Sequence, residues 1–354
     1  MSKNNVDEFL SKKITIVNFI MCVLVVMLHS YNAERYTEIA AYKMVSGAEF
    51  FISRTLGNLA VPTFFLISAF LFFRDYGISE IVPKYIKRFK SLVIPYLTWN
   101  LLYLLAFAAL ISFPISNAFM DTKEIEISWR LVAESILFHK YNGVYWYMYN
   151  SIIFVIISPL IYLVMRKKTG IVLVAALLII SRWVGKIPAN AYGVYVESLS
   201  YWCLGAWVAL NKTEWINYRN RPRAFGAAGG ALILFIVRFY LEFILPEGTI
   251  SNFSLQMLLF LNVIMVWIAF DLFSMNAVFP WMGLTFFIYS FHPLLVDMVK
   301  KGIAALLPNS AAWAIINYLL SGLVGVLVSV CVAGILIRYC RPLWNVLNGG
   351  RIRK

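Results

Sequence analysis

The chain contains few charged residues, and the acidic ones are the scarcer kind. Only 14% of its 354 residues are Asp, Glu, Lys or Arg, whereas 61% are hydrophobic. The surface of a soluble domain must face water, so a soluble protein of this length is not apolar throughout. The composition therefore excludes a soluble globular protein and predicts one that crosses a membrane several times.

Cysteine and histidine are also rare, with four and three residues. The cysteines form no CxxC pair and the histidines no HxxxH pair, and such spacings are typical of metal sites. The three histidines, His29, His139 and His292, are far apart in the sequence. We therefore expect no metal ion, no disulfide and no bound cofactor, and thiols that behave as small apolar side chains.

Ten apolar runs of roughly 20 residues, the length that crosses a bilayer, follow one another along the chain. They predict an all-α fold, a polytopic bundle of about ten transmembrane helices in a single domain that spans residues 1–354. No small-residue cleavage site follows the first run, so we expect no signal peptide to be removed. The runs lie near residues 14–32, 55–73, 91–113, 144–165, 171–187, 192–210, 224–245, 252–274, 280–299 and 312–338.

The net charge of +14 raises the question of a nucleic-acid partner, but the basic residues are distributed as in a membrane protein. If the N-terminus is cytoplasmic, twenty Lys and Arg residues fall in cytoplasmic segments and ten in outer segments. The positive-inside rule then predicts that both termini lie in the cytoplasm, which agrees with an even number of spans. The charge therefore indicates contact with membrane lipid, and we expect no nucleic-acid partner.

Residues 74–96 predict a helix with apolar residues on one face and basic residues on the other. Its cations include Lys87, Arg88 and Lys90. Such a helix is expected to lie on the inner surface of the membrane, where anionic lipid headgroups attract it. A phosphate-rich cytoplasmic ligand is the other interpretation, because ammonium and guanidinium groups pair with phosphate oxygens.

His29 lies near the outer end of the first apolar run, roughly 22 Å along the predicted helix at 1.5 Å per residue. An ionisable side chain inside a bilayer is rare and usually faces the bundle interior, a partner or water. By position alone, a wetted residue at the membrane surface is an equal interpretation. Four charged residues fall at a similar depth, namely Arg182, Glu197, Arg238 and Glu242.

This shared depth also has two interpretations. Arg238 and Glu242 are one helical turn apart, so they can neutralise each other as a structural pair, which is the favoured interpretation. The other is a polar pocket that opens outward and holds a hydroxylated acceptor. His292, in the segment FHP, is expected to make a structural or substrate contact in that pocket rather than to catalyse.

Several separated motifs together resemble a known family. They are VVMLHS at 25–30, VPTFFLISAFLFF at 61–73, YIKRFKSLVIPYLTWN at 85–100, YWYMYNSIIFVIISPLI at 145–161 and FFIYSFHPLL at 286–295. In this order and spacing, the chain resembles the acyltransferase-3 family over nearly its whole length. That resemblance implies an enzyme that transfers an acyl group other than an amino-acyl group.

The reaction implied by the resemblance takes an acyl group, often acetyl, from cytoplasmic acyl-CoA to a hydroxyl of a cell-surface polysaccharide or its lipid-linked precursor, in a bacterial plasma or inner membrane. His29 matches the essential histidine of the family and would act as general base or as transient acyl acceptor. The donor phosphates would meet Lys87, Arg88, Lys90 and Ser91. The acceptor pocket would contain Arg182, Arg238, Glu242 and His292.

The chain departs from the family pattern at two places. Many members have a second arginine where Ser91 stands, and an acidic and a basic residue where Thr15 and Asn18 stand. A divergent or inactive member is compatible with these departures. Two other function classes remain open: a carrier or flippase for a lipid-linked sugar, and a purely structural membrane subunit. Donor-dependent acylation distinguishes the enzyme from both.

Overall fold

The computed structural model describes residues 3–112, 126–190, 192–246, 252–273 and 278–351. Its first half contains α1 (Lys3–Ser30), α2 (Tyr42–Phe50), α3 (Ala60–Phe73), α4 (Ile81–Arg88), α5 (Ile94–Ile111), α6 (Trp129–Phe138), α7 (Trp146–Ile156), α8 (Ser158–Met165) and α9 (Gly170–Ile180). Its second half contains β1 (Lys186–Ile187), β2 (Val194–Tyr195), α10 (Val196–Asn211), α11 (Thr213–Asn217), α12 (Arg221–Phe239), α13 (Asn252–Ala269), α14 (Thr285–Leu306), α15 (Ala311–Tyr339) and α16 (Arg341–Leu347). The two strands form one antiparallel pair.

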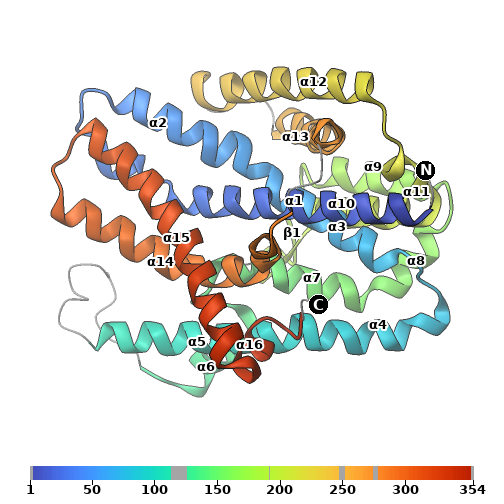
Figure 1. Ribbon diagram of the computed structural model, residues 1–354, viewed down its shortest axis with the longest axis horizontal. Coiled ribbons are helices and arrows are strands. Elements are labelled where there is room, and N and C mark those ends of the chain that lie inside the picture. The colour runs from blue at the N-terminus through green and yellow to red at the C-terminus, as the bar shows by residue number, and fades with distance from the viewer. Residues whose placement is uncertain (1–2, 113–125, 191, 247–251, 274–277, 352–354) are drawn as a thin grey trace.

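Short 3₁₀ and π turns extend or join these helices. The 3₁₀ turns are η1 (Ala33–Tyr36), η3 (Gly57–Leu59), η4 (Ile78–Glu80), η7 (Gly143–Tyr145), η9 (Phe270–Leu272) and η10 (Pro280–Leu284). The π turns are η2 (Phe51–Leu56), η5 (Phe89–Val93) and η8 (Tyr240–Ile244). In Figure 1, α1 runs through the middle of the bundle, with α12 and α13 on one side and α5 and α16 on the other.

Seven helices of the described chain are long and apolar enough to cross a membrane. They are Glu8–Tyr36, Tyr42–Phe73, Ile81–Ile111, Arg221–Ile244, Ser254–Leu272, Pro280–Leu306 and Ala311–Tyr339. An eighth span would be α7 together with α8, which are bent by 67° relative to each other. Pro159 lies at the start of α8 and lacks the amide N–H that would continue α7, which accounts for the bend.

Each of the ten predicted apolar runs contains a helix, although α9 and α10 have only 11 and 16 residues and the last positions of two runs, 113 and 274, lie outside the described residues. The all-α, polytopic architecture is therefore confirmed, whereas ten spans and the position of the termini stay predictions. The fifth predicted run, 171–187, is too long. Its helix ends at Ile180, where Ser181 folds back to donate to the Leu178 carbonyl, and β1 follows after a short turn.

The basic helix of residues 74–96 is not a separate element, whereas its place on the inner membrane surface stays a prediction. Instead, α4 continues through η5 into α5, and the three form one helix of 31 residues (Figure 1). At 1.5 Å per residue this helix is roughly 46 Å long, which exceeds the roughly 30 Å hydrocarbon core. The amphipathic pattern belongs to the first turns of this long helix, where Lys87 and Lys90 are exposed and Arg88 is half-buried.

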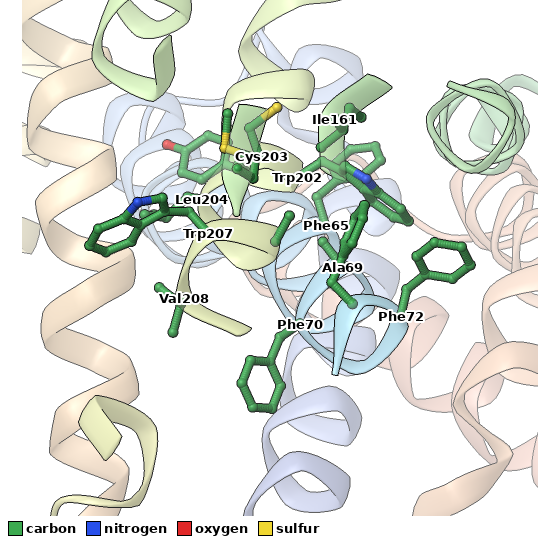
Figure 2. Packing of buried hydrophobic residues seen from close by; sticks show 14 of the residues in the cluster. Phe65, Ala69, Phe70, Phe72, Ile161, Trp202, Cys203, Leu204, Trp207 and Val208 are labelled. Atoms are coloured by element: carbon green, nitrogen blue, oxygen red, sulfur yellow. The ribbon is translucent and has the colours of Figure 1, made fainter. Parts of the chain in front are cut away.

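The core of the bundle is densest where α10 packs along α3. Figure 2 shows that aromatic side chains from both helices interleave there, among them Phe65, Phe72 and Trp202. Gly205 permits the close approach, because any side chain at this position would overlap the Leu66 carbonyl of α3. This tight pair fixes the start of α10 against the start of α3, where the polar residues described next are found.

Candidate active site

His29 is the second-last residue of α1 and lines a cavity of about 480 Å³. Its side chain is half-buried, so it is neither fully buried in the core nor fully exposed at the surface. The walls come from α1, η3, α3, the start of α7, β2, α10, α12 with η8, and α13. They include Val25, Leu28, His29, Gly57, Asn58, Val61, Pro62, Phe65, Trp146, Tyr195, Glu197, Ser198, Tyr201, Arg238, Glu242, Leu255, Gln256 and Leu259.

Arg238 and Glu242 bring opposite charges into this cavity. The Arg238 guanidinium lies 3.0 Å from the Glu242 carboxylate and donates a second hydrogen bond, also of 3.0 Å, to the Thr55 carbonyl. Its side chain is 1% exposed and that of Glu242 is 14% exposed. The predicted ion pair is confirmed, and the same pair lines the cavity beside His29. The structural and the pocket interpretations therefore hold together.

Glu197 and Gln256 are cavity residues that we did not place in the predicted site. The Gln256 amide donates to the Glu197 carboxylate over 3.4 Å. Glu197 lies in the first turn of α10, where the helix dipole favours a negative charge. The depth of Glu197 along its predicted helix was the sequence signal that could have placed it in the site. Gln256 had only the weaker signal of an amide within an apolar run, where polar side chains often join helices.

His292 lies behind His29 rather than on the cavity wall. The two imidazole rings have their centres 5.3 Å apart, and His292 is fully buried. Its Nδ1 lies 3.0 Å from the Ile288 carbonyl and so carries the proton as the donor, while Nε2 has no hydrogen-bond partner in the described structure. His292 is thus placed to position His29. Lys300 also holds this end of α1, by donating to the His29 carbonyl over 2.9 Å.

Arg182, like His292, is a predicted acceptor residue that does not line the cavity. It lies beyond the end of α9, in the turn that follows, and is exposed. Because α9 ends early, at Ile180, the chain leaves the helix before Arg182. Its neighbour Ser181 instead approaches Gln256, with 3.4 Å between Oγ and Oε1.

The predicted donor residues divide into two groups. Lys87 and Lys90 are exposed, whereas Arg88 is half-buried and its guanidinium lies 5.4 Å from the centre of the Phe72 ring. Ser91 lies against the C-terminal turn, because a side chain at Gly349 would come within 2.7 Å of the Ser91 carbonyl. One helix thus presents two cations to the surface and turns a third into the protein.

A comparison of the sequence with models of known protein families agrees with the geometry of this site. Residues 12–338 match the acyltransferase-3 model, described as an acyltransferase domain. The chain belongs to the acyltransferase-3 family. With its apolar helices, this acyltransferase is a multi-pass membrane protein. Neither the curated proteins nor the solved structures contain a significant match to the chain.

Proposed function

We propose that this acyltransferase moves an acyl group, most simply acetyl, from cytoplasmic acyl-CoA to a hydroxyl of a cell-surface polysaccharide or lipid-linked glycan. The observation that carries the proposal is that His29 lines a cavity together with the polar side chains of Arg238, Glu242, Glu197 and Gln256. These side chains offer donors and acceptors suited to the hydroxyls of a sugar.

His29 has two possible roles in this reaction. As general base, its imidazole takes the acceptor proton while the acceptor oxygen attacks the thioester carbonyl. The carbon–sulfur bond then breaks, and the imidazolium returns the proton to the leaving thiolate. Such proton transfer contributes about 10²–10⁴-fold to the rate. As nucleophile, His29 takes the acyl group first, releases the thiol, and then passes the group to the acceptor hydroxyl.

The proposal includes ten spans with both termini in the cytoplasm of a bacterial plasma membrane. Ten helical segments and the excess of basic residues on one side support this topology. The donor phosphates would then be bound from the cytoplasm by Arg88, with Lys87 and Lys90 at the membrane surface. Single-cysteine labelling at both ends of the chain tests the topology, and protection of only one end from an impermeant reagent contradicts it.

The reaction is tested with purified protein in lipid nanodiscs, radiolabelled acetyl-CoA and a pooled glycan acceptor. We expect acceptor-stimulated turnover in the native protein and its loss, by at least about 100-fold, in His29→Gln. His139→Asn is the matched control, because it replaces a histidine of the segment between α6 and η7, away from the cavity. Equal turnover of His29→Gln and the native protein would overturn the proposed role.

A carrier or flippase for a lipid-linked sugar is the second candidate function. The cavity supports this second function because ionisable groups inside a membrane often mark a substrate path. A carrier would move the glycan without an acyl donor and would tolerate His29→Gln. Transport of a fluorescent lipid-linked sugar by proteoliposomes, measured without acyl-CoA, separates the two functions.

A further inference from the structure

A second polar cavity, of about 320 Å³, lies under the C-terminal end of the chain. It is formed by η10, the end of α15, α16 and the residues that follow α16. The lining side chains combine cations, amides and an indole ring, and the whole set is Gly283, Leu284, Ile337, Arg341, Trp344, Asn345, Asn348 and Arg351. Of these, only the ends of η10 and α15 fall within the predicted spans, and none was in the predicted site.

Arg351 is the most unusual residue of this cavity. Its guanidinium lies 3.9 Å from the centre of the Phe286 ring and donates to the Asn348 carbonyl over 2.9 Å. Across the described residues no carboxylate forms an ion pair with Arg351 or with Arg88, its positively charged neighbour. Burial, and then the charge of Arg88, lower the pKa of Arg351 to about 10. Two cations that repel each other in a partly buried site are stabilised by a bound anion.

Asn348 provides a second, independent indication of a ligand. Its side chain is 3% exposed, and its Oδ1 has no hydrogen-bond partner in the described part of the chain. A buried acceptor without a partner costs about 1–3 kcal/mol unless a ligand satisfies it. Trp344, in the same cavity, adds an apolar ring surface. Guanidinium groups, an amide acceptor and an aromatic ring together match the phosphates, the amino group and the ring of a nucleotide.

The C-terminal turn is firmly attached, so this cavity is a built feature rather than a loose chain end. The Trp99 indole of α5 donates to the Leu347 carbonyl over 2.9 Å. Gly349 and Gly350 have φ values of +65° and +63°, a conformation that glycine adopts readily. Gly349 can lie close to the Ser91 carbonyl because it has no side chain, since a Cβ there would come within 2.7 Å of that oxygen.

The cavity also lies at a useful distance from His29. Phe286, beneath Arg351, and His292, beside His29, are six residues apart on α14, which is roughly 9 Å along the helix. Tyr289 lies between them, and its ring centre is 6.4 Å from that of His292 and 5.9 Å from that of Tyr147. Arg88 and Arg351 are in turn the charged neighbours of the Tyr147 hydroxyl. A flexible arm attached to the phosphates is long enough to bring a thioester from here to His29.

We propose that the C-terminal cavity binds the nucleotide part of the acyl donor, with the lining cations Arg351 and Arg341 on its phosphates and Asn348 and Trp344 around its base. This inference rests on the proposed function, because it takes the donor to be a thioester of a nucleotide-bearing thiol such as coenzyme A. It adds a second, distant segment of the chain to the donor site predicted around Arg88.

Binding of adenosine 3′,5′-bisphosphate tests the cavity without any acyl transfer. The probe is titrated by calorimetry into nanodiscs that contain native protein, Arg351→Gln or Arg219→Gln. We expect Arg351→Gln to weaken binding by about 10- to 100-fold, the effect of losing charge-assisted hydrogen bonds. Arg219→Gln is the matched control, because Arg219 also lies over an aromatic ring, 3.6 Å from Phe9, but outside the cavity. We expect it to bind as the native protein does.

Folding is controlled by size-exclusion profile and melting temperature. If Arg351→Gln does not fold, Arg341→Gln replaces it, because Arg341 lines the cavity but is exposed on α16. We expect this variant to weaken binding by about 3- to 10-fold. Equal affinity of the native protein and a folded cavity variant would overturn the proposal. A second result would also overturn it, namely that Arg351→Gln weakens the binding of anionic phosphatidylglycerol in the nanodiscs but leaves the affinity for the nucleotide unchanged.

The outcomes also separate this inference from the proposed function. If the protein transfers acetyl from acetyl-CoA but Arg351→Gln binds the nucleotide as tightly as the native protein does, the proposed function is supported and the cavity assignment is overturned. Arg351-dependent nucleotide binding without any acyl transfer would support the cavity and count against the function. Acetyl-pantetheine carries the thioester but lacks the nucleotide. If the cavity binds the nucleotide, acyl transfer from acetyl-pantetheine should be equally slow in the native protein and in Arg351→Gln.

Discussion

Lys13 and Arg351 are both cations that lie over aromatic rings, yet they differ in what neutralises them. The Lys13 ammonium lies 4.1 Å from the Trp267 ring centre and 2.7 Å from the Asp271 carboxylate, which belongs to η9. Arg351 has a ring beneath it but a second cation, Arg88, as its charged neighbour. The first arrangement is complete within the protein, whereas the second needs an anion from outside. Lys13, paired with a carboxylate, is thus read as a structural cation, and Arg351, without one, as part of a binding site.

The largest expected effect comes from breaking the complete pair. Lys13→Met leaves Asp271 as a buried carboxylate without its partner, since the two side chains are only 1% and 7% exposed. We expect a loss of about 3–5 kcal/mol in the free energy of unfolding, measured by denaturant titration in detergent micelles. The double variant Lys13→Met, Asp271→Leu should recover most of it, because no unpaired charge remains. A single variant as stable as the native protein would contradict the comparison.

Arg351→Gln should behave in the opposite way. It removes a repulsion with Arg88 as well as a cation, so we expect the free energy of unfolding without ligand to change by less than about 1 kcal/mol. Coenzyme A at about 100 times its dissociation constant should stabilise the native protein by about 2.7 kcal/mol, and the same concentration should stabilise the variant by only about 0.4–1.4 kcal/mol, as a 10- to 100-fold weaker affinity requires. Thermal unfolding with and without coenzyme A measures both quantities. A variant that coenzyme A still stabilises fully would place Arg351 with Lys13 among the structural cations.

The smallest expected effect concerns His139, a titratable residue outside both arrangements. Burial lowers the pKa of His139 from 6.5 to about 4. As the pH falls below 6.5 the unfolded chain takes up a proton that the folded chain refuses, so stability is lost between pH 6.5 and about 4. We expect a loss of about 1 kcal/mol, reduced by partial exposure.

His139→Asn should remove this acid sensitivity. Asparagine tolerates the φ of +49° at this position, so the exchange adds little backbone strain. Unfolding at pH 7.5 and at pH 5 measures the effect in both proteins. If both lose the same stability over this range, the acid sensitivity arises elsewhere, and the charged pairs of the bundle become the next residues to examine.

Much of the fold was predictable, because a membrane imposes a strong one-dimensional pattern. Every spanning segment must satisfy its own backbone hydrogen bonds and face lipid, so apolar runs become helices. The ten runs each contain a helix for this reason. Two predicted helix boundaries were wrong because neighbouring structure overrode the pattern. The basic helix continues through η5 into α5, and α9 ends at Ile180 rather than reaching residue 187.

The site was predictable only in part. Depth along each helix placed His29 with Arg238 and Glu242, and the cavity brings these three together. Depth along a predicted helix means nothing once the helix has ended, and Arg182 falls outside the cavity because α9 ends at Ile180. Depth also does not tell which way a side chain points, and this hid the difference between Arg88, which turns inward, and Lys87, which does not.

The sequence by itself determined the membrane class, the helices, the family resemblance and the depth of the ionisable residues, since each depends on local composition and spacing. Only the tertiary structure decided which of these residues meet. Lys13 and Asp271 are 258 positions apart, and Arg351 reaches the neighbourhood of Arg88 from the other end of the chain. In lipid, no hydrophobic force selects one helix neighbour over another, so packing of small residues and a few polar contacts decides the arrangement. That arrangement turns scattered charges into a closed pair, a histidine cavity and an open cationic site.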